Sequence, residues 1–310
     1  MLQRGAKTAI AASVMIAGFL SVFFLTRFVE SVRPPMPAGY EDGDLAVEGS
    51  KLKGFVFGAE GLVADWYWMN SLQYMGKKIT AVGLSNLNLE DLRPLNPRLL
   101  YPYLNNASDL DPEFLAPYLY GATILPAIDA DQAIQLAEKG IANNPDVWRL
   151  HQYLGYIYWR RGDYEKAAEV YLEGSRIANA PPFLKMMAAR MKTDGGSRDL
   201  ARDMYRQIAD ESQDDVSRQS AELHLLQIDS LDERDIINPA LQAFRDQHGR
   251  CIDRWQELLS AVAGKRLPNG GKLRIDQDNN IVDPSGAPYF LDKQKCEAAI
   301  DTSRSKVPAA

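Results

Sequence analysis

The sequence predicts an all-α protein: a solenoid of antiparallel helix pairs, with an apolar helix before it and a small β-hairpin appendage after it. Three observations lead to this fold class. Small and aromatic residues recur every 34 residues through the middle of the chain. An uncharged apolar run fills 8–26, and apolar residues alternate with polar ones on both sides of an Asn-rich turn in 273–282. A helical array, a membrane helix and a hairpin account for these patterns in turn.

The 34-residue period joins three neighbouring stretches. Small residues at fixed places let two antiparallel helices approach closely, and large residues fill the space between them. A further step of 34 fails at 222–235, which is the pattern of a terminal, capping repeat. The first matching set is Gly121, Ile124, Ala133 and Gly140 against Gly155, Tyr158, Ala167 and Gly174, and the second is Ala188, Ala189, Ala201 and Tyr205 against Leu154, Gly155, Ala167 and Tyr171.

The central stretch resembles the tetratricopeptide-repeat (TPR) family. It reads His151-x-x-Leu154-Gly155-x-x-Tyr158, with His151 where the family has tryptophan, and Gly162-Asp163-Tyr164 follows as the turn. The resemblance is strongest over 148–181 and extends over 113–147 and 182–215. It implies a curved surface that holds another polypeptide, with no built-in chemistry. A generic helical bundle that happens to repeat is the alternative.

The 34-residue period and the apolar spacing together predict where the helices lie. Leu62, Trp66, Met69 and Leu72 have helical spacing. The aromatic side chains Trp66, Tyr67, Trp68 and Tyr74 favour core packing of a first helix over the alternative, a binding face. The segment 76–98 is expected to interrupt this helix with Gly and Pro. A helix at 99–110 completes this first pair. Three further pairs of helices are expected, at 113–144 with a break near Pro126, at 147–178, and at 182–210 with Gly195 and Gly196 at the turn. Single helices are then expected at 214–229, from Pro239 to 249, and at 252–262.

The run 8–26 is close to the roughly 20 apolar residues that a bilayer requires. A secretory signal peptide is the rival interpretation, but its apolar region is usually shorter and ends at a small-x-small site, which Arg27 and Phe28 do not provide. We therefore expect an uncleaved, single-pass anchor in a bacterial inner membrane. Basic residues flank both ends, so the positive-inside rule discriminates weakly. A short basic N-terminus ahead of a first apolar helix places the remaining domain in the periplasm.

These features divide the chain into five parts: a membrane anchor at 1–27, a Pro/Gly-rich linker at 28–58, a TPR-like helical domain at 59–264, a small β appendage at 265–300 and a disordered tail at 301–310. Cys251 and Cys296 are the two cysteines, and neither has a neighbour at metal-ligand spacing. In an exported chain such a pair predicts one disulfide, with two unrelated buried thiols as the alternative.

The composition excludes several function classes. The net charge is −6 with no basic stripe, so no nucleic-acid partner is expected. Asp276, Asp278 and Asn280 resemble the start of a calcium loop that lacks the later Gly and Glu, and the three histidines are far apart. No phosphate loop, dinucleotide fingerprint or nucleophile motif is present. We expect no enzyme activity, no cofactor and no metal.

The function that this pattern favours is a membrane-tethered TPR scaffold or assembly factor. It would bind a protein or peptide segment near the inner membrane, in envelope biogenesis or secretion. A permanent structural subunit of a membrane complex is the alternative. The residues expected to bind the partner lie opposite the packing side of two successive first helices, unless neighbouring helices cover Tyr156 and Trp159. They are Arg149, Gln152, Tyr156, Trp159, Phe183, Met186 and Arg190.

Overall fold

The structure, a computed structural model, describes residues 2–32, 48–83 and 86–308. The chain divides into two compact units, Met1–Ala46 and Val47–Ala310. The described residues are mostly helical, with twelve α-helices and two small antiparallel hairpins, which confirms the all-α prediction at this level. Much of the expected linker, 33–47, lies outside the described residues.

The first unit contains one long helix, α1 (Leu2–Val32). Its stretch Met15–Val32 is long and apolar enough to cross a membrane. The expected anchor at 8–26 lies within this helix, and the helix continues past the expected end of the anchor to Val32.

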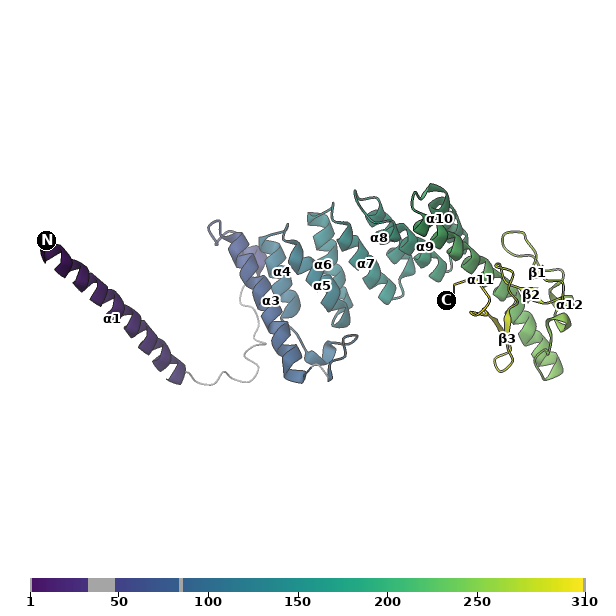
Figure 1. The fold of residues 1–310 in the computed structure, drawn as a ribbon, viewed down its shortest axis with the longest axis horizontal. Coiled ribbons are helices and arrows are strands. Elements are labelled where there is room, and N and C mark those ends of the chain that lie inside the picture. Colours follow the sequence, from purple (N-terminus) through teal and green to yellow (C-terminus); the bar gives the residue numbers. More distant parts are fainter. Residues whose placement is uncertain (1, 33–47, 84–85, 309–310) are drawn as a thin grey trace. The chain divides into compact units, whose positions relative to one another are not determined.

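The second unit is a succession of helices, each packed against the next from α3 to α11 (Figure 1). The expected break near Pro126 is present as a 3₁₀ turn between α5 and α6. The helices are α2 (Gly49–Leu52), α3 (Glu60–Val82), α4 (Leu100–Leu110), α5 (Leu115–Ile124), α6 (Ala130–Asn143), α7 (Trp148–Arg160), α8 (Tyr164–Ser175), α9 (Phe183–Asp194), α10 (Arg198–Glu211), α11 (Asp215–His248) and α12 (Leu259–Val262), with 3₁₀ turns at Arg93–Leu95, Leu125–Ala127 and Trp255–Glu257.

Glycines stand where paired helices touch. A Cβ atom on Gly155 would lie 2.9 Å from the ring of Tyr171, and one on Gly174 would lie 2.6 Å from Cβ of His151. Gly121 and Gly140, each 34 residues earlier, face Leu136 and Tyr118 in the same way. The repeated glycines therefore mark the close contacts between α5 and α6 and between α7 and α8.

The helix starts share the same period. Asp129 caps α6 by accepting hydrogen bonds from the N–H groups of Asp131 and Gln132, and Asp163, 34 residues later, caps α8 by accepting one from Lys166. Such caps satisfy backbone donors that have no partner within the helix. The sequence period thus sets both the helix starts and the helix contacts.

Helix α3 departs from the sequence prediction in two ways. It continues through Gly76 to Val82, so the expected interruption at 76 is absent. Its buried side is Ala64, Tyr67, Ser71, Tyr74 and Met75, whereas Leu62, Trp66 and Met69 are exposed. The expected core packing is confirmed for Tyr67 and Tyr74 and is wrong for Trp66, because α4 packs against the face that carries the two tyrosines.

The C-terminal helices also differ from the prediction. One helix, α11, spans both expected segments and has Pro239 inside it. Proline removes one backbone hydrogen bond from a helix interior. Ile237, Ala240 and Leu241 beside it are buried in the core shared with the appendage, and this packing offsets the loss. The expected helix at 252–262 is not continuous and is present as the 3₁₀ turn at Trp255–Glu257 and the short α12.

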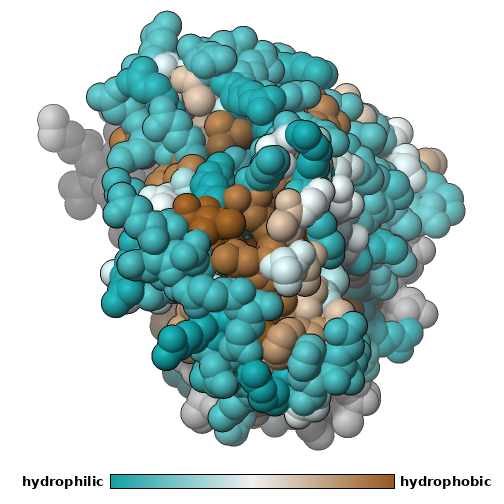
Figure 2. Space-filling view, turned by 90° about the vertical axis from the view of Figure 1, so that its right-hand side faces the viewer, coloured by the Kyte–Doolittle hydropathy of each residue, from teal (hydrophilic) through white to brown (hydrophobic). Residues whose placement is uncertain are grey.

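The appendage contains two hairpins, and the first of them is the hairpin that the sequence predicted. Strand β1 (Arg274–Ile275) pairs with β2 (Ile281–Val282), and β3 (Phe290–Asp292) pairs with β4 (Glu297–Ala299), both antiparallel. Asn279 adopts φ 60° in the turn between β1 and β2, a conformation that asparagine tolerates. Figure 2 looks onto this end of the unit and shows hydrophobic side chains gathered in a hollow among hydrophilic ones.

The two cysteines are paired. The Cα atoms of Cys251 and Cys296 lie 5.6 Å apart and their sulfur atoms are at disulfide distance, 2.12 Å. The pair ties the turn that follows α11 to the start of β4. Residues 301–308 differ from the expected disordered tail, because Val307 is buried and the N–H of Lys306 donates to the hydroxyl of Ser285.

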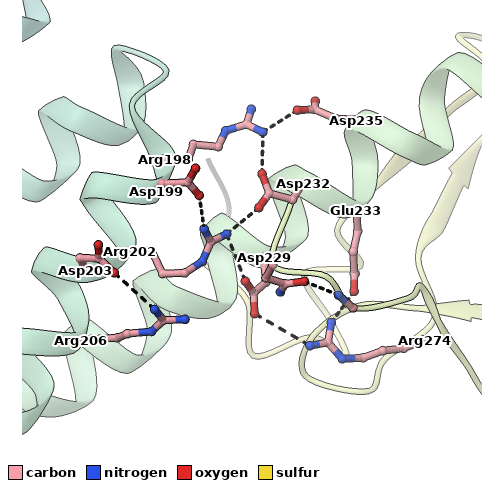
Figure 3. Close-up of polar contacts among 12 residues, drawn as sticks. Arg198, Asp199, Arg202, Asp203, Arg206, Asp229, Asp232, Glu233, Asp235 and Arg274 are labelled. Carbon is pink, nitrogen blue, oxygen red and sulfur yellow. Dashed lines mark hydrogen bonds and ion pairs between the residues drawn. The ribbon is translucent and has the colours of Figure 1, made fainter. Parts of the chain in front are cut away.

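A chain of ion pairs links α10, α11 and the appendage (Figure 3). Arg202 donates to Asp232 at 2.5 Å, and both side chains are almost fully buried. Arg198 reaches the other oxygen of Asp232 at 3.0 Å, while Arg274 of β1 pairs with the buried Glu233. Buried charges are tolerated only when they are paired and hydrogen-bonded, so these contacts fix how α10 and the appendage sit on α11.

Candidate partner-binding surface

A hollow of about 340 Å³ lies where α5, α7 and α9 come together. The first helices of three successive pairs, α5, α7 and α9, contribute most of its lining. Tyr171 of α8, whose side chain is 2% exposed, also lines it. We call it the aromatic hollow. Its lining residues are Ala122, Thr123, Gln152, Tyr153, Tyr156, Tyr171, Phe183 and Met187.

Three of the seven predicted residues line this hollow: Gln152, Tyr156 and Phe183. Tyr156 is 38% exposed and Phe183 is 40% exposed, so neighbouring helices do not cover them. Trp159 is half-buried, and its ring meets that of Tyr156 edge-on with 5.6 Å between centroids. The exposed ring of Tyr156 therefore packs against a second aromatic ring, that of Trp159.

The two predicted arginines lie beside the aromatic rings. The guanidinium of Arg190 is 5.9 Å from the ring centroid of Trp159, and that of Arg149 is 5.4 Å from the centroid of Trp148. Trp148 in turn meets Phe183 edge-on at 6.3 Å. Both arginines are exposed, and Arg190 also lies 3.7 Å from the carboxylate of Asp194. Cation–π contacts hold the charged groups near the hollow while they stay in water.

Met186 does not belong to this surface. It packs against the core cluster of α9, α10 and α11 that includes Tyr205 and Ile228. Met187, the next residue, lines the hollow instead. A helix that packs on two neighbours leaves only a narrow face exposed. At this position the predicted residue, Met186, lies beside that face, and the next residue, Met187, lies on it.

Sequence reasoning missed Ala122, Thr123, Tyr153, Tyr171 and Met187. Part of the signal was available, because Ala122 stands 34 residues before Tyr156, and Tyr153 stands 34 before Met187. Extending the period backward from the predicted Tyr156 finds Ala122, whereas Tyr153 and Met187 correspond only to each other, so the period does not find either of them. Tyr171 could not be found in this way, since it is a core residue whose ring edge happens to reach the hollow.

The hollow is lined by apolar, aromatic and uncharged polar side chains. Burial raises the pKa of Tyr171 to about 12, so its phenol stays neutral at physiological pH. Gln152 and the hydroxyl of Thr123 add neutral polar groups. Across the residues that the structure describes, no group of three or more His, Cys, Asp or Glu side chains could hold a metal ion.

No family model matches the chain, and no curated protein matches it.

His151, on the packing side of α7, gives the helix pair a pH dependence. Burial lowers its pKa below the ordinary 6.5, and Glu173 opposes this shift. Above pH 6.5 the imidazole is neutral in the folded and the unfolded chain. As the pH falls below 6.5, the unfolded chain takes up the proton more readily, so stability is lost.

We therefore expect the melting temperature to fall between pH 7.5 and pH 5.5, and to fall less in His151→Leu, which cannot take up the proton. His248→Leu, at an exposed histidine of α11, is the control for the loss of an imidazole elsewhere in the chain. Thermal unfolding followed by circular dichroism at both pH values measures the difference. Identical profiles for His151→Leu and the parent protein would contradict the prediction.

Proposed function

We propose that this protein is a membrane-tethered scaffold of the TPR type, which holds an extended segment of a partner protein in the aromatic hollow. The observation that carries the proposal is the set of exposed aromatic side chains contributed by α7 and α9 at a shared hollow. Aromatic and arginine side chains dominate the binding energy of many protein interfaces.

The TPR-type arrangement is supported by the period itself. Helix caps at Asp129 and Asp163 and helix contacts at Gly121 and Gly155 keep the same 34-residue spacing. Units that repeat both their starts and their contacts stack with a regular rotation, which produces a continuous face built from first helices. The aromatic hollow lies on such helices, α5, α7 and α9.

The partner segment is expected to combine a large apolar side chain with acidic neighbours. A hollow of about 340 Å³ with a mostly aromatic and apolar lining accommodates such a side chain. Arg149 and Arg190 lie beside Trp148 and Trp159, and can reach carboxylates on the same segment.

The location also forms part of the proposal. Helix α1 would anchor the protein in the inner membrane of a bacterium, and the bonded cysteines favour an oxidising compartment. Together they support a periplasmic position for the second unit and a role in envelope biogenesis or secretion.

Photo-crosslinking in native membranes tests the proposal. A photoreactive amino acid at Gln152 should capture a partner, and the same group at the exposed Gln219 of α11 should not. Changing both Tyr156 and Phe183 to Ala in the Gln152 probe should reduce capture at least tenfold, because the rings supply most of the contact area. Leu200→Ala, another half-exposed apolar residue that does not line the hollow, should leave capture unchanged.

The melting temperature of each variant separates binding from folding. Lost capture with an unchanged melting curve supports the hollow as the binding site, whereas a large fall in melting temperature would show that the two rings are core and that the assignment is wrong. A partner that co-purifies in fixed stoichiometry would favour the alternative, a permanent subunit of a membrane complex.

A further inference from the structure

A second apolar surface lies at the start of the Val47–Ala310 unit. Five large apolar side chains are exposed there, on α3 and on the turn that leads directly into it, with exposed fractions between 55% and 98%. We call them the α3 patch. They are Phe55, Phe57, Leu62, Trp66 and Met69.

The patch is confined to one side and one end of the helix. Leu62, Trp66 and Met69 follow the i, i+4, i+7 spacing of a single helical face. Further along the same face the exposed residues are Gln73, Gly76 and Thr80, which are polar or small. The apolar face is therefore short, about two turns. Leu72, 38% exposed, lies at its edge, and the positions beyond it along the same face are polar or small.

The helix does not need this face for its own packing. Its opposite side buries Tyr67, Tyr74 and Met75, and Tyr67 and Tyr74 both contact the ring of Tyr103 of α4. Exposed apolar area costs about 25 cal/mol per Å², and the first helix of an array normally has a polar outer face. Five large apolar side chains gathered in this way indicate a surface that is covered in the working protein.

The chain itself indicates what covers the patch. Only residues 33–47 separate Val32, the end of the membrane-spanning candidate, from this region. A chain of that length reaches at most roughly 50 Å when fully extended. If α1 spans a membrane, this link keeps the patch within reach of the bilayer, so a weak affinity for lipid is sufficient to hold it there.

The side chains suit the boundary between headgroups and acyl chains. Tryptophan is enriched at that depth because one edge of its ring is apolar and the other donates a hydrogen bond. Short amphipathic faces that carry Trp, Phe and Leu insert shallowly and lie in the membrane plane. Glu60 and Asp65 border the patch and Lys53 precedes it, so the local charge is mixed and apolar insertion is the main attraction.

We propose that the α3 patch rests on the lipid bilayer, with Phe55, Phe57, Leu62, Trp66 and Met69 inserted at the level of the headgroups. This contact would add a second attachment point to the anchor and so restrict the orientation of the helical unit against the membrane. The proposal rests on the membrane anchoring proposed for α1 and does not depend on a partner in the aromatic hollow.

Fluorescence of the full-length protein in vesicles tests this proposal. Both cysteines are bonded, so a single introduced thiol can be labelled selectively. Met69→Cys carries an environment-sensitive dye in one sample, and Val216→Cys, 78% exposed on α11, carries it in the control. The vesicles contain phosphatidylcholine and phosphatidylglycerol, with or without lipid that bears a spin label near the headgroup.

We expect the dye at position 69 to emit at shorter wavelength than the dye at 216, and to be quenched at least twofold more by the spin-labelled lipid. Both effects should persist at high salt, because the contact is mainly apolar. A dye at 69 that is as water-exposed as the dye at 216 would overturn the proposal.

Two further outcomes would also overturn it in favour of another occupant. Shielding at position 69 that persists in detergent and rises with protein concentration would identify a second copy of this chain. Shielding that appears in native membranes and not in pure lipid vesicles would identify a partner protein.

Discussion

Replacing Arg202 by Met is expected to destabilise the protein by about 3 kcal/mol, which is the scale on which breaking a buried ion pair acts. Arg202 donates to Asp232 at 2.5 Å, and the two side chains are 6% and 5% exposed. Methionine fills much of the same space and removes the charge. Asp232 then keeps only Arg198 as a partner, at 3.0 Å.

The matched control lies one helical turn further along α10. Arg206 pairs with Asp203 at 3.3 Å, but both side chains are more than half exposed. Exposed pairs contribute about 0–1 kcal/mol, so Arg206→Met should change the free energy of unfolding by less than 1 kcal/mol. Urea denaturation of the two variants in the same detergent measures both values. Equal effects would show that the buried chain of ion pairs does not hold α10 and α11 together.

Gly174→Ala is expected to destabilise the protein by about 1–3 kcal/mol, the usual scale of overpacking. The new Cβ would lie 2.6 Å from Cβ of His151, an atom attached directly to the backbone of α7. Side-chain rotation cannot relieve this overlap, so α7 and α8 must move apart. The intrinsic preference of a helix for alanine, about 1 kcal/mol, offsets only part of the loss.

Gly76→Ala is the control, and its expected effect on the free energy of unfolding has the opposite sign. Gly76 lies inside α3, and a Cβ added there would meet no heavy atom within 4 Å. The higher intrinsic helix propensity of alanine is then the main effect, so the free energy of unfolding is expected to rise by about 0.5–1 kcal/mol. Thermal or urea unfolding of both variants tests the pair. Stabilisation by Gly174→Ala would mean that the close contact between α7 and α8 is absent.

Spacing along the sequence determined a large part of the fold. The uncharged run at 8–26 lies within α1, and the 34-residue period located the pairs α5–α6, α7–α8 and α9–α10. These predictions succeeded because they rest on local requirements. A helix start needs a cap such as Asp163, and two helices in contact need a small residue such as Gly155. The pairing of Cys251 with Cys296 was expected from their number and the apolar N-terminal helix.

Only the tertiary structure decided which helix faces are open. Leu62, Trp66 and Met69 have the spacing of a core face, yet they are exposed because α4 packs on the other side of α3. Met186 and Met187 are chemically alike and both partly buried, but their neighbours place one against a core cluster and the other on the lining of the aromatic hollow. Arg202 gave no sequence signal, since its burial depends on Asp232, which is 30 residues away along the chain. Periodicity specifies which residues share a face, but burial of that face depends on contacts between distant segments, and residue spacing does not encode those contacts.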